Sequence, residues 1–299
     1  MKLFTGLSAF PLTPMKDERV DEGSFTKLIQ RLNKAGVDSI TALGSTGSYM
    51  YLSREERARV ARLAVEHAGN VPVLVGVGAI RTAHVLEHID DAKAAGAAGV
   101  LLAPVGYQKL SDDEVFDLFR AATEHSELPV VVYDNPGTTH FEFSIELYAR
   151  IAALPGIASI KIPGVPTDPV AAKAHVSAVR KVIPEHVSIG VSGDGFGAAG
   201  LIAGCDAWYC VIGGTLPEPA LAITRAAQSQ DDEVALQLSG QLNPIWELFA
   251  EFGGSLRVTA AIAEHLKLVN HNCLPLPVQG LNSEQRERVA QVLKELPAR

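Results

Sequence analysis

Lys161 is the residue whose position in this sequence points most directly to covalent chemistry. It interrupts an otherwise apolar run, Ile157-Ala158-Ser159-Ile160-Lys161-Ile162, close to the end of an expected strand. Burial in such a strand disfavours the charged ammonium and lowers a lysine pKa, by roughly 3–5 units at the extreme. A neutral amine attacks a carbonyl carbon to form a Schiff base. The pattern leaves the ordinary alternative open, a lysine that reaches the sheet edge or pairs with a carboxylate.

Tyr133 closes the apolar run that precedes the Lys161 strand in the chain, Val130-Val131-Val132-Tyr133. If the two strands are neighbours in a sheet, this phenol lies close to the lysine. A hydroxyl in that place can carry protons during imine formation, and general acid–base catalysis of this kind contributes about 10²–10⁴-fold. The alternative is a large amphipathic side chain that caps the core.

The segment Gly44-Ser45-Thr46-Gly47 is a loop of small residues that follows an expected strand. Such a loop can turn backbone N–H groups and two hydroxyls toward a carboxylate or phosphate. The same residue types also make ordinary turns. The loop therefore indicates an anion site only in combination with other residues.

Short apolar strands alternate with amphipathic helical segments along most of the chain. Ser53-x-x-Glu56 and Ser111-x-x-Glu114 are capping boxes that predict helix starts, and Gly36, Gly69 and Gly96 are placed to end helices. The expected strands are Leu3–Phe10, Val37–Leu43, Val71–Gly76, Gly99–Ala103, Pro129–Tyr133, Ile157–Ile162, Val187–Val191 and Asp206–Ile212.

Eight strand–helix units predict the α/β class and a closed (β/α)8 TIM barrel over residues 1–229, which carries the active site. A doubly wound open sheet is the rival, but it usually has fewer strands and a nucleotide-binding first turn. Residues 230–299 are expected to be wholly helical, divided by Pro244, Pro275 and Pro277 into about three helices. They are interpreted as a C-terminal helical appendage packed on the barrel, not as an independent domain.

Active groups in such barrels lie at the C-terminal ends of the strands and in the loops that follow. Besides Lys161, Tyr133 and the Ser45–Thr46 loop, this rule selects three more places. They are Tyr107, the segment Ser192-Gly193-Asp194, and the segment Gly213-Gly214-Thr215.

Composition narrows the range of partners. The chain has 299 residues and a formal net charge of −8 without acidic blocks, which argues against nucleic acid or an anionic membrane as the main partner. The three cysteines cannot form a disulfide framework, so a cytoplasmic location is expected. No apolar stretch is free enough of glycine and charge to predict a membrane span.

Several familiar sequence motifs for binding or catalysis are incomplete in this chain. Arg81 stands where a dinucleotide fingerprint needs its third glycine, and Asp194 stands where a nucleophile elbow needs its last glycine. His84 and His88 are four residues apart, but without a third ligand they are interpreted as part of a solvated helix face.

Taken together, these segments resemble the family of dihydrodipicolinate synthase and N-acetylneuraminate lyase, over almost the whole chain. Gly44-Ser45-Thr46-Gly47 is similar to the family's G-[ST]-T-G-E loop, Tyr133-Asp134-Asn135-Pro136 to its Y-N-x-P, and Lys161 falls at its Schiff-base lysine. The resemblance implies that Lys161 condenses with pyruvate or another 2-oxo acid while Tyr133 shuttles protons.

The resemblance also implies roles for the residues around this pair. Ser45 would link Tyr133 to Tyr107, which the family often contributes from a neighbouring subunit. Thr46 and the backbone amides of its loop, with Gly47, would hold the 2-oxo acid carboxylate. No metal and no organic cofactor are implied, and a homo-oligomer is expected, a tetramer built as a dimer of dimers.

The sequence departs from the family at positions that bear on the second substrate, an aldehyde that it does not identify. Ser48 replaces the loop glutamate, and Thr138 stands where synthase members carry an arginine that grips the aldehyde's carboxylate. The run through Gly213 and Gly214 is more similar to the lyase branch, in which this loop contacts sugar-acid hydroxyls, and Asp194 is similarly placed to accept them. Ile162-Pro163 is also unlike the family pattern.

The leading hypothesis is therefore an aldolase or lyase that cleaves or forms a 2-oxo acid through a pyruvate imine. Authentic 4-hydroxy-tetrahydrodipicolinate synthase, which condenses pyruvate with aspartate semialdehyde, is the alternative within the same chemistry. A deoxy sugar-acid dehydratase is a third member of that class. A binding or regulatory homologue that has lost turnover is the alternative from a different class.

Overall fold

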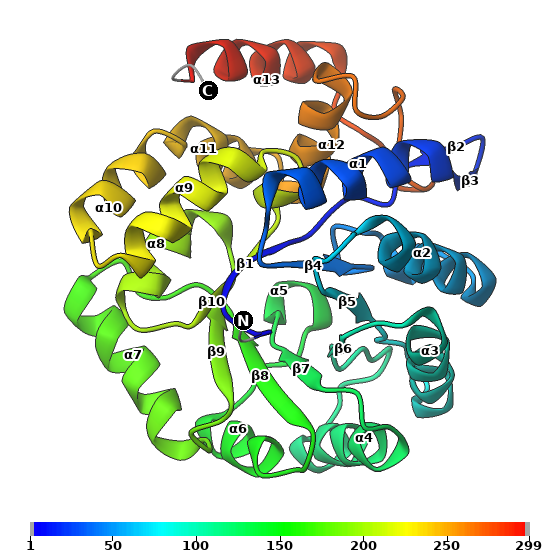
Figure 1. Cartoon of the computed structure of the whole chain (residues 1–299), viewed down its shortest axis with the longest axis vertical. Coiled ribbons are helices and arrows are strands. Elements are labelled where there is room, and N and C mark those ends of the chain that lie inside the picture. The colour runs from blue at the N-terminus through cyan, green and yellow to red at the C-terminus, as the bar shows by residue number, and fades with distance from the viewer. Residues whose placement is uncertain (1–2, 297–299) are drawn as a thin grey trace.

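A closed barrel of eight parallel strands forms the centre of the computed structural model, which describes residues 3–296 (Figure 1). Each barrel strand pairs with the next one along the chain, and β1 pairs with both β4 and β10 to close the ring. The barrel strands are β1 (Gly6–Ala9), β4 (Ser39–Ala42), β5 (Val73–Gly76), β6 (Gly99–Leu102), β7 (Val130–Tyr133), β8 (Ile157–Ile162), β9 (Ser188–Val191) and β10 (Ala207–Cys210). Each lies within the range expected from the sequence, so the predicted (β/α)8 barrel is confirmed.

Helices surround the barrel on the outside (Figure 1). The main ones are α1 (Glu22–Ala35), α2 (Arg54–His67), α3 (Thr82–Ala95), α4 (Asp112–His125), α6 (Ile145–Ala152), α7 (Pro169–Val182), α8 (Gly197–Ile202) and α9 (Pro217–Gln228). Short helices in the loops are η1 (Tyr49–Tyr51), α5 (Pro136–Thr139), η2 (Asp194–Phe196) and η3 (Ile212–Gly214). Both predicted capping boxes are present, at Ser53 and at Ser111.

The hairpin of β2 (Met15–Lys16) and β3 (Arg19–Val20) was not expected from the sequence. Its turn residues, Asp17 and Glu18, both have a positive φ, of 51° and 55°. Strands this short carry no readable periodicity, and the turn lacks the Asn-Gly or Asp-Gly signal of a two-residue hairpin.

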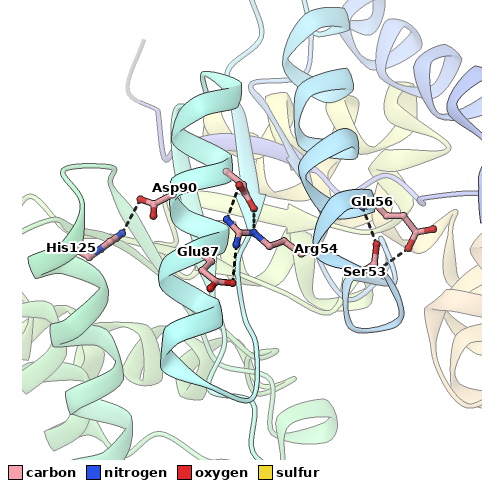
Figure 2. A network of polar contacts seen from close by, with 7 residues as sticks. Ser53, Arg54, Glu56, Glu87, Asp90 and His125 are labelled. Carbon is pink, nitrogen blue, oxygen red and sulfur yellow. Dashed lines mark hydrogen bonds and ion pairs between the residues drawn. The ribbon is translucent and has the colours of Figure 1, made fainter.

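Surface ion pairs join neighbouring helices of the ring. Arg54 of α2 pairs with Glu87 and Asp91 of α3, at 3.0 and 2.8 Å, and His125 of α4 pairs with Asp90 of α3 at 2.8 Å. Figure 2 shows Arg54 beside Glu87 and His125 beside Asp90. Such exposed pairs contribute about 0–1 kcal/mol each. The ring is therefore held mainly by the apolar layer between helices and sheet, which is the largest buried cluster of the described residues.

The barrel interior is a smaller core, separate from the layer between sheet and helices. It consists of Phe10, Leu74, Leu101, Ala103, Val131, Tyr133, Ala207 and Tyr209. Side chains along each strand alternate between the two cores, so neighbouring residues of one strand have different surroundings. On β8, Ile160 and Ile162 pack toward the helices, and Lys161 between them points inward.

Four α-helices follow the barrel within the described part of residues 230–299, where about three were expected. They are α10 (Asp232–Gly240), α11 (Asn243–Glu251), α12 (Ser255–His265) and α13 (Ser283–Glu295). The additional break lies at Gly253 and Gly254, whose φ values of 72° and 122° end one helix before the next begins. The outermost residues of the two expected units, 1–2 and 297–299, lie outside the described residues.

The appendage is attached to the barrel by a third buried cluster. Ala260 and Ala263 of α12 pack in it with Leu12, which follows β1, and with Leu28 of α1. The backbone N–H of Met15 also donates to the Cys273 carbonyl at 2.8 Å. This part of the chain is therefore packed onto the same end of the molecule as the loops that follow the strands.

Among the helices of residues 3–296, none combines the length and the apolar character that a membrane crossing requires.

Candidate active site

Lys161 stands on β8 with its side chain inside the barrel. It is paired in register with Tyr133 on β7 and with Gly190 on β9, and only 5% of its surface is exposed. A side chain on Gly190 would meet the Tyr209 ring, since a Cβ built there lies 2.2 Å from Tyr209 Cε2. The glycine therefore leaves room for the Tyr209 ring beside the lysine.

The surroundings of the Lys161 amine are mostly aromatic. Its Nζ lies 4.0 Å from the ring centroid of Tyr133 and 5.5 Å from that of Phe10. Burial lowers the pKa of Lys161, while the nearby Tyr133 and the Asp194 carboxylate oppose that shift. The neutral amine is the nucleophilic form, so this environment favours the species that attacks a carbonyl.

The Tyr133 hydroxyl belongs to a polar chain at the bottom of the cavity. The Nδ2 atom of Asn135 donates to it at 2.8 Å, and Ser45 Oγ lies 3.2 Å away. The same Asn135 amide donates to Thr138 Oγ1 at 3.0 Å. Asn135 has no role among the sequence-based predictions. Its position two residues after Tyr133, at the end of a strand, is the signal that could have pointed to it.

The loop after β4 is shaped by close backbone contacts. Ser48 N donates to Ser45 O at 3.0 Å, and Ser48 has a φ of 54°. A Cβ on Gly47 would come within 3.0 Å of the Leu43 backbone. Ser45, Thr46 and Ser48 line the cavity. Gly47 lies outside the lining and serves the turn, so its predicted contact with the carboxylate remains a prediction.

Asp194 lines the cavity, but its carboxylate is already engaged. Its two oxygens accept hydrogen bonds from the backbone N–H groups of Val211 and Ile212, at 2.9 and 2.6 Å. Burial raises the pKa of Asp194 to about 6, and these bonds oppose the shift. Asp194, in the loop after β9, is therefore hydrogen-bonded to the loop after β10 and joins the two loops. Its acceptance of a substrate hydroxyl stays a prediction.

Gly213 and Gly214 lie behind the cavity wall instead of in it. A Cβ on Gly214 would be 2.3 Å from the Phe10 carbonyl oxygen, and one on Gly213 would be 3.2 Å from Cys210 Sγ. Gly214 is thus required by its close approach to the Phe10 backbone, and Gly213 packs tightly against the Cys210 side chain. Val211 is the residue of this loop that lines the cavity, and the substrate contacts of the two glycines stay a prediction.

Tyr107 is not brought to the site of its own chain. It is 90% exposed and borders a different hollow, with Lys109 and His140 among its neighbours. The predicted link from Ser45 to Tyr107 is therefore absent within the described residues of one chain.

Asp134 lies directly behind the catalytic face of β7. It is 5% exposed, its backbone N–H donates to the Lys161 carbonyl at 3.1 Å, and one carboxylate oxygen accepts from the Tyr148 hydroxyl. The other oxygen has no partner among the described residues. Burial raises the pKa of Asp134 to about 6, so this carboxyl is a buried titratable group adjoining the site.

The cavity measures about 630 Å³ and extends well beyond the lysine, within the usual range for small-molecule sites. Its outer wall comes from the appendage, which the sequence did not connect with the site. The lining residues of that wall are Phe249, Gly253, Gly254, Ser255, Leu256 and Arg257. Nothing in the local sequence of α12 signals this role, because it depends on how the helix packs against the barrel.

No cluster of three or more His, Cys, Asp or Glu side chains within residues 3–296 has the geometry of a metal site. The expected solvated face is correct for His84 and wrong for His88, which is 9% exposed. Burial and the Arg57 guanidinium lower the pKa of His88 to about 4. Arg57 is buried as well, and it donates to the carbonyls of Gly76 and Gly78 at 2.9 and 3.0 Å.

The sequence matches the model of the dihydrodipicolinate synthetase family over residues 3–296. It is 34% identical over 246 residues to the 4-hydroxy-tetrahydrodipicolinate synthase of Hyphomonas neptunium, which covers 80% of this chain and 81% of that relative. It is 29% identical over 296 residues to the enzyme of the same name from Phenylobacterium zucineum, with 98% and 97% covered.

Two crystal structures show the same fold. The dihydrodipicolinate synthase of Agrobacterium tumefaciens superposes with a TM-score of 0.94 at 42% identity, over 99% of both chains. The chloride-inhibited dihydrodipicolinate synthase of Acinetobacter baumannii, crystallised with pyruvate, superposes with a TM-score of 0.88 at 26% identity, over 98% of this chain and 99% of that one. This chain thus belongs to the dihydrodipicolinate synthetase family and is a lyase of the Schiff-base-forming, class I aldolase kind.

Proposed function

We propose that this enzyme forms an imine between Lys161 Nζ and the ketone carbon of pyruvate, and then forms or cleaves a carbon–carbon bond at the former methyl carbon. The observation that carries the proposal is the buried Lys161 amine, 4.0 Å from the ring centroid of Tyr133. A structural relative crystallised with pyruvate supports the choice of the 2-oxo acid.

The proposed steps use residues of this cavity. The lone pair of neutral Lys161 attacks the ketone carbon, and the Tyr133 hydroxyl carries one amine proton to the oxygen, which gives a carbinolamine. A second proton, taken up from solvent and delivered through Tyr133, lets this oxygen leave as water and gives the protonated imine. Loss of a methyl proton from the imine leaves an enamine, whose carbon attacks an aldehyde. In the opposite direction, the same steps in reverse order release the aldehyde. The covalent imine itself accepts the electrons, so the proposal includes neither a metal nor an organic cofactor.

The carboxylate of the 2-oxo acid is assigned to the loop after β4. Thr46 is 4% exposed and lines the cavity with Ser45, and hydroxyl groups of this kind bind carboxylates in sites from which water is excluded. In this arrangement the ketone carbon faces Lys161 and the rest of the substrate extends toward the outer wall.

Borohydride trapping tests the proposal. Reduction in the presence of pyruvate should add one hydride-reduced pyruvyl group to a peptide that contains Lys161, as measured by mass spectrometry. Lys161→Ala should abolish the modification, while the surface variant Lys173→Ala should keep it. A wild-type protein that remains unmodified by pyruvate would overturn the proposal.

Authentic 4-hydroxy-tetrahydrodipicolinate synthase activity is the second candidate, and the names of the sequence relatives favour it. The neutral Thr138, in the place of the family's aldehyde-binding arginine, stands against it. Condensation of pyruvate with aspartate semialdehyde, and rescue of a lysine auxotroph at native expression, distinguish the synthase from the other lyases of the family.

The assembly and location form part of the same proposal. Tyr107 is 90% exposed and remote from its own cavity, which supports a homo-oligomer, a dimer of dimers, in which a neighbouring copy supplies this tyrosine. The three cysteines are free and buried, which supports a reducing, cytoplasmic setting. Sedimentation of wild type and of Tyr107→Ala tests the assembly.

A further inference from the structure

Two basic side chains line the cavity among the described residues, Lys161 at its inner end and Arg257 in its outer wall. They differ in chemistry. Lys161 is almost fully buried and its pKa is lowered, whereas an arginine keeps its charge at any relevant pH. The outer wall therefore contains the permanent positive charge of the cavity.

No carboxylate of the cavity neutralises this charge. Asp194 is the sole acidic residue in the described lining, and its oxygens accept from Val211 and Ile212. Arg257 Nε donates a hydrogen bond to the Gln279 carbonyl, at 3.0 Å. Within residues 3–296, its two terminal nitrogens have no hydrogen-bond partner and no ion pair.

Arg257 is carried by a firmly packed element. It lies in the first turn of α12, and the following residues are buried, with Val258 and Ile262 at 0% exposure. The bond to Gln279 restrains the inner part of the guanidinium and leaves its outer edge available. A planar guanidinium edge binds a carboxylate with two parallel hydrogen bonds.

We propose that Arg257 binds a second carboxylate of the substrate, at the end of the carbon chain remote from Lys161. This inference rests on the proposed imine chemistry and deepens it, because it assigns the substrate class. The enzyme then acts on 2-oxo acids that carry a terminal carboxylate, made from or cleaved to a carboxylate-bearing aldehyde. A cavity of about 630 Å³ is larger than the three-carbon pyruvate requires. Thr138 is uncharged and has one hydroxyl proton to donate, so it does not offer the charged, two-bond site of a guanidinium.

The first experiment compares 2-oxo acids of equal chain length. The concentration dependence of borohydride trapping at Lys161 is measured for 2-oxoadipate against 2-oxohexanoate, and for 2-oxoglutarate against 2-oxovalerate. We expect half-saturation about 10- to 100-fold lower for the better dicarboxylic acid than for its matched monocarboxylic acid. Arg257→Gln should abolish that preference, so that the two acids of each pair reach half-saturation at similar concentrations.

Two further variants separate binding from structure. Arg257→Lys keeps the charge without the planar fork and should retain part of the preference. Arg288→Gln removes an appendage arginine that is paired with Glu251 and lies outside the cavity lining, so the preference should be intact. A preference that survives Arg257→Gln, or is missing from the wild type, would overturn the inference.

A second measurement does not depend on imine formation. Glutarate and valerate have no ketone, so calorimetric titration reports their non-covalent binding alone. Tighter binding of glutarate that is lost in Arg257→Gln supports the inference, and equal binding of the two acids contradicts it. Failure of pyruvate to label Lys161 would instead overturn the proposed imine chemistry, so the two failures are distinguishable.

Discussion

The inner end of the cavity and its outer wall differ in how their side chains are held. At the inner end, Lys161 and Tyr133 stand in register on adjacent strands of the closed barrel, and the Tyr133 hydroxyl has two partners on neighbouring loops. The outer wall comes from the appendage, with Gly253 and Gly254 exposed between α11 and α12, and its Arg257 has one bond to a backbone carbonyl.

This difference separates the two halves of the proposed reaction. The groups assigned to imine formation depend on strand pairing, which cannot change at one position without disturbing its neighbours. The groups assigned to the far end of the substrate depend on one turn and on the first turn of one helix. Substrate choice can therefore vary through the appendage while the covalent chemistry of the barrel is retained.

The largest expected effect comes from removing the proton-carrying group of the inner end. Tyr133→Phe keeps the ring beside Lys161 and deletes the hydroxyl, so the single-turnover rate of pyruvate trapping should fall about 10²–10⁴-fold. The same change at Tyr51 of η1, an exposed tyrosine that also lines the cavity, is the control and should have little effect on this rate. Equal rates for Tyr133→Phe and wild type would remove Tyr133 from the mechanism.

The two regions should also respond differently to loss of packing. Ile262→Ala in α12 and Ile160→Ala on β8 each truncate a fully buried side chain, and each should lower the free energy of unfolding by about 2–5 kcal/mol in urea titrations. Ile262→Ala should weaken the preference for dicarboxylic acids more than pyruvate trapping, and Ile160→Ala should do the opposite. If both variants changed the dicarboxylic-acid preference and the pyruvate trapping to the same extent, the separation between the inner end and the outer wall would be contradicted.

The Asp134 carboxyl behind the inner end should make stability depend on pH. Its pKa is raised from 3.8 to about 6 in the folded chain. Between these values the folded state binds more protons than the unfolded state, so stability falls as pH rises through this window. Asp134→Asn should remove a decline of at most about 3 kcal/mol between pH 4 and 7, measured by urea unfolding. If stability declined by the same amount in the variant, the decline would have to come from other groups, and Asp194 would be the next candidate.

The smallest expected effect concerns the Tyr133 partners. Ser45→Ala removes the longer of the two contacts, at 3.2 Å, and Asn135→Ala the shorter, at 2.8 Å. One such hydrogen bond contributes about 0.5–1.5 kcal/mol, so Ser45→Ala should slow pyruvate trapping by about 10-fold at most. Asn135→Ala should slow it more. The reverse order would show that the serine hydroxyl is the principal proton partner.

The strands and the inner site were predictable because their signals are local. Buried parallel strands have apolar side chains on both faces, so a lysine at residue 161 and a tyrosine at residue 133 stand out against their neighbours. The rule that barrel sites lie at the C-terminal strand ends then brings distant segments together. No functional role was predicted for Asn135, because polar residues are common in the turns that follow strands.

Other features were missed or had no local signal. The pair Gly253-Gly254 is a helix-breaking signal in the sequence, but the expected division of residues 230–299 rested on the prolines, so the break between α11 and α12 was missed. His88 has the spacing of an exposed helix face and is nevertheless buried beside Arg57. Gly213 and Gly214 occur in a segment that resembles a substrate loop, but their backbones are needed for contact with Phe10 and Cys210.

The amino-acid sequence by itself determined the barrel, the order of its strands and the lysine within it. Hydrophobic periodicity, helix-capping residues and a charged residue in an apolar run can each be recognised within a short segment. Only the tertiary structure decided which residues of distant segments line the cavity with that lysine. Arg257 is more than ninety residues away along the chain, and its place in the wall follows from the packing of α12 on Leu12 and Leu28. Packing between distant segments depends on shape and volume complementarity, which no local pattern records.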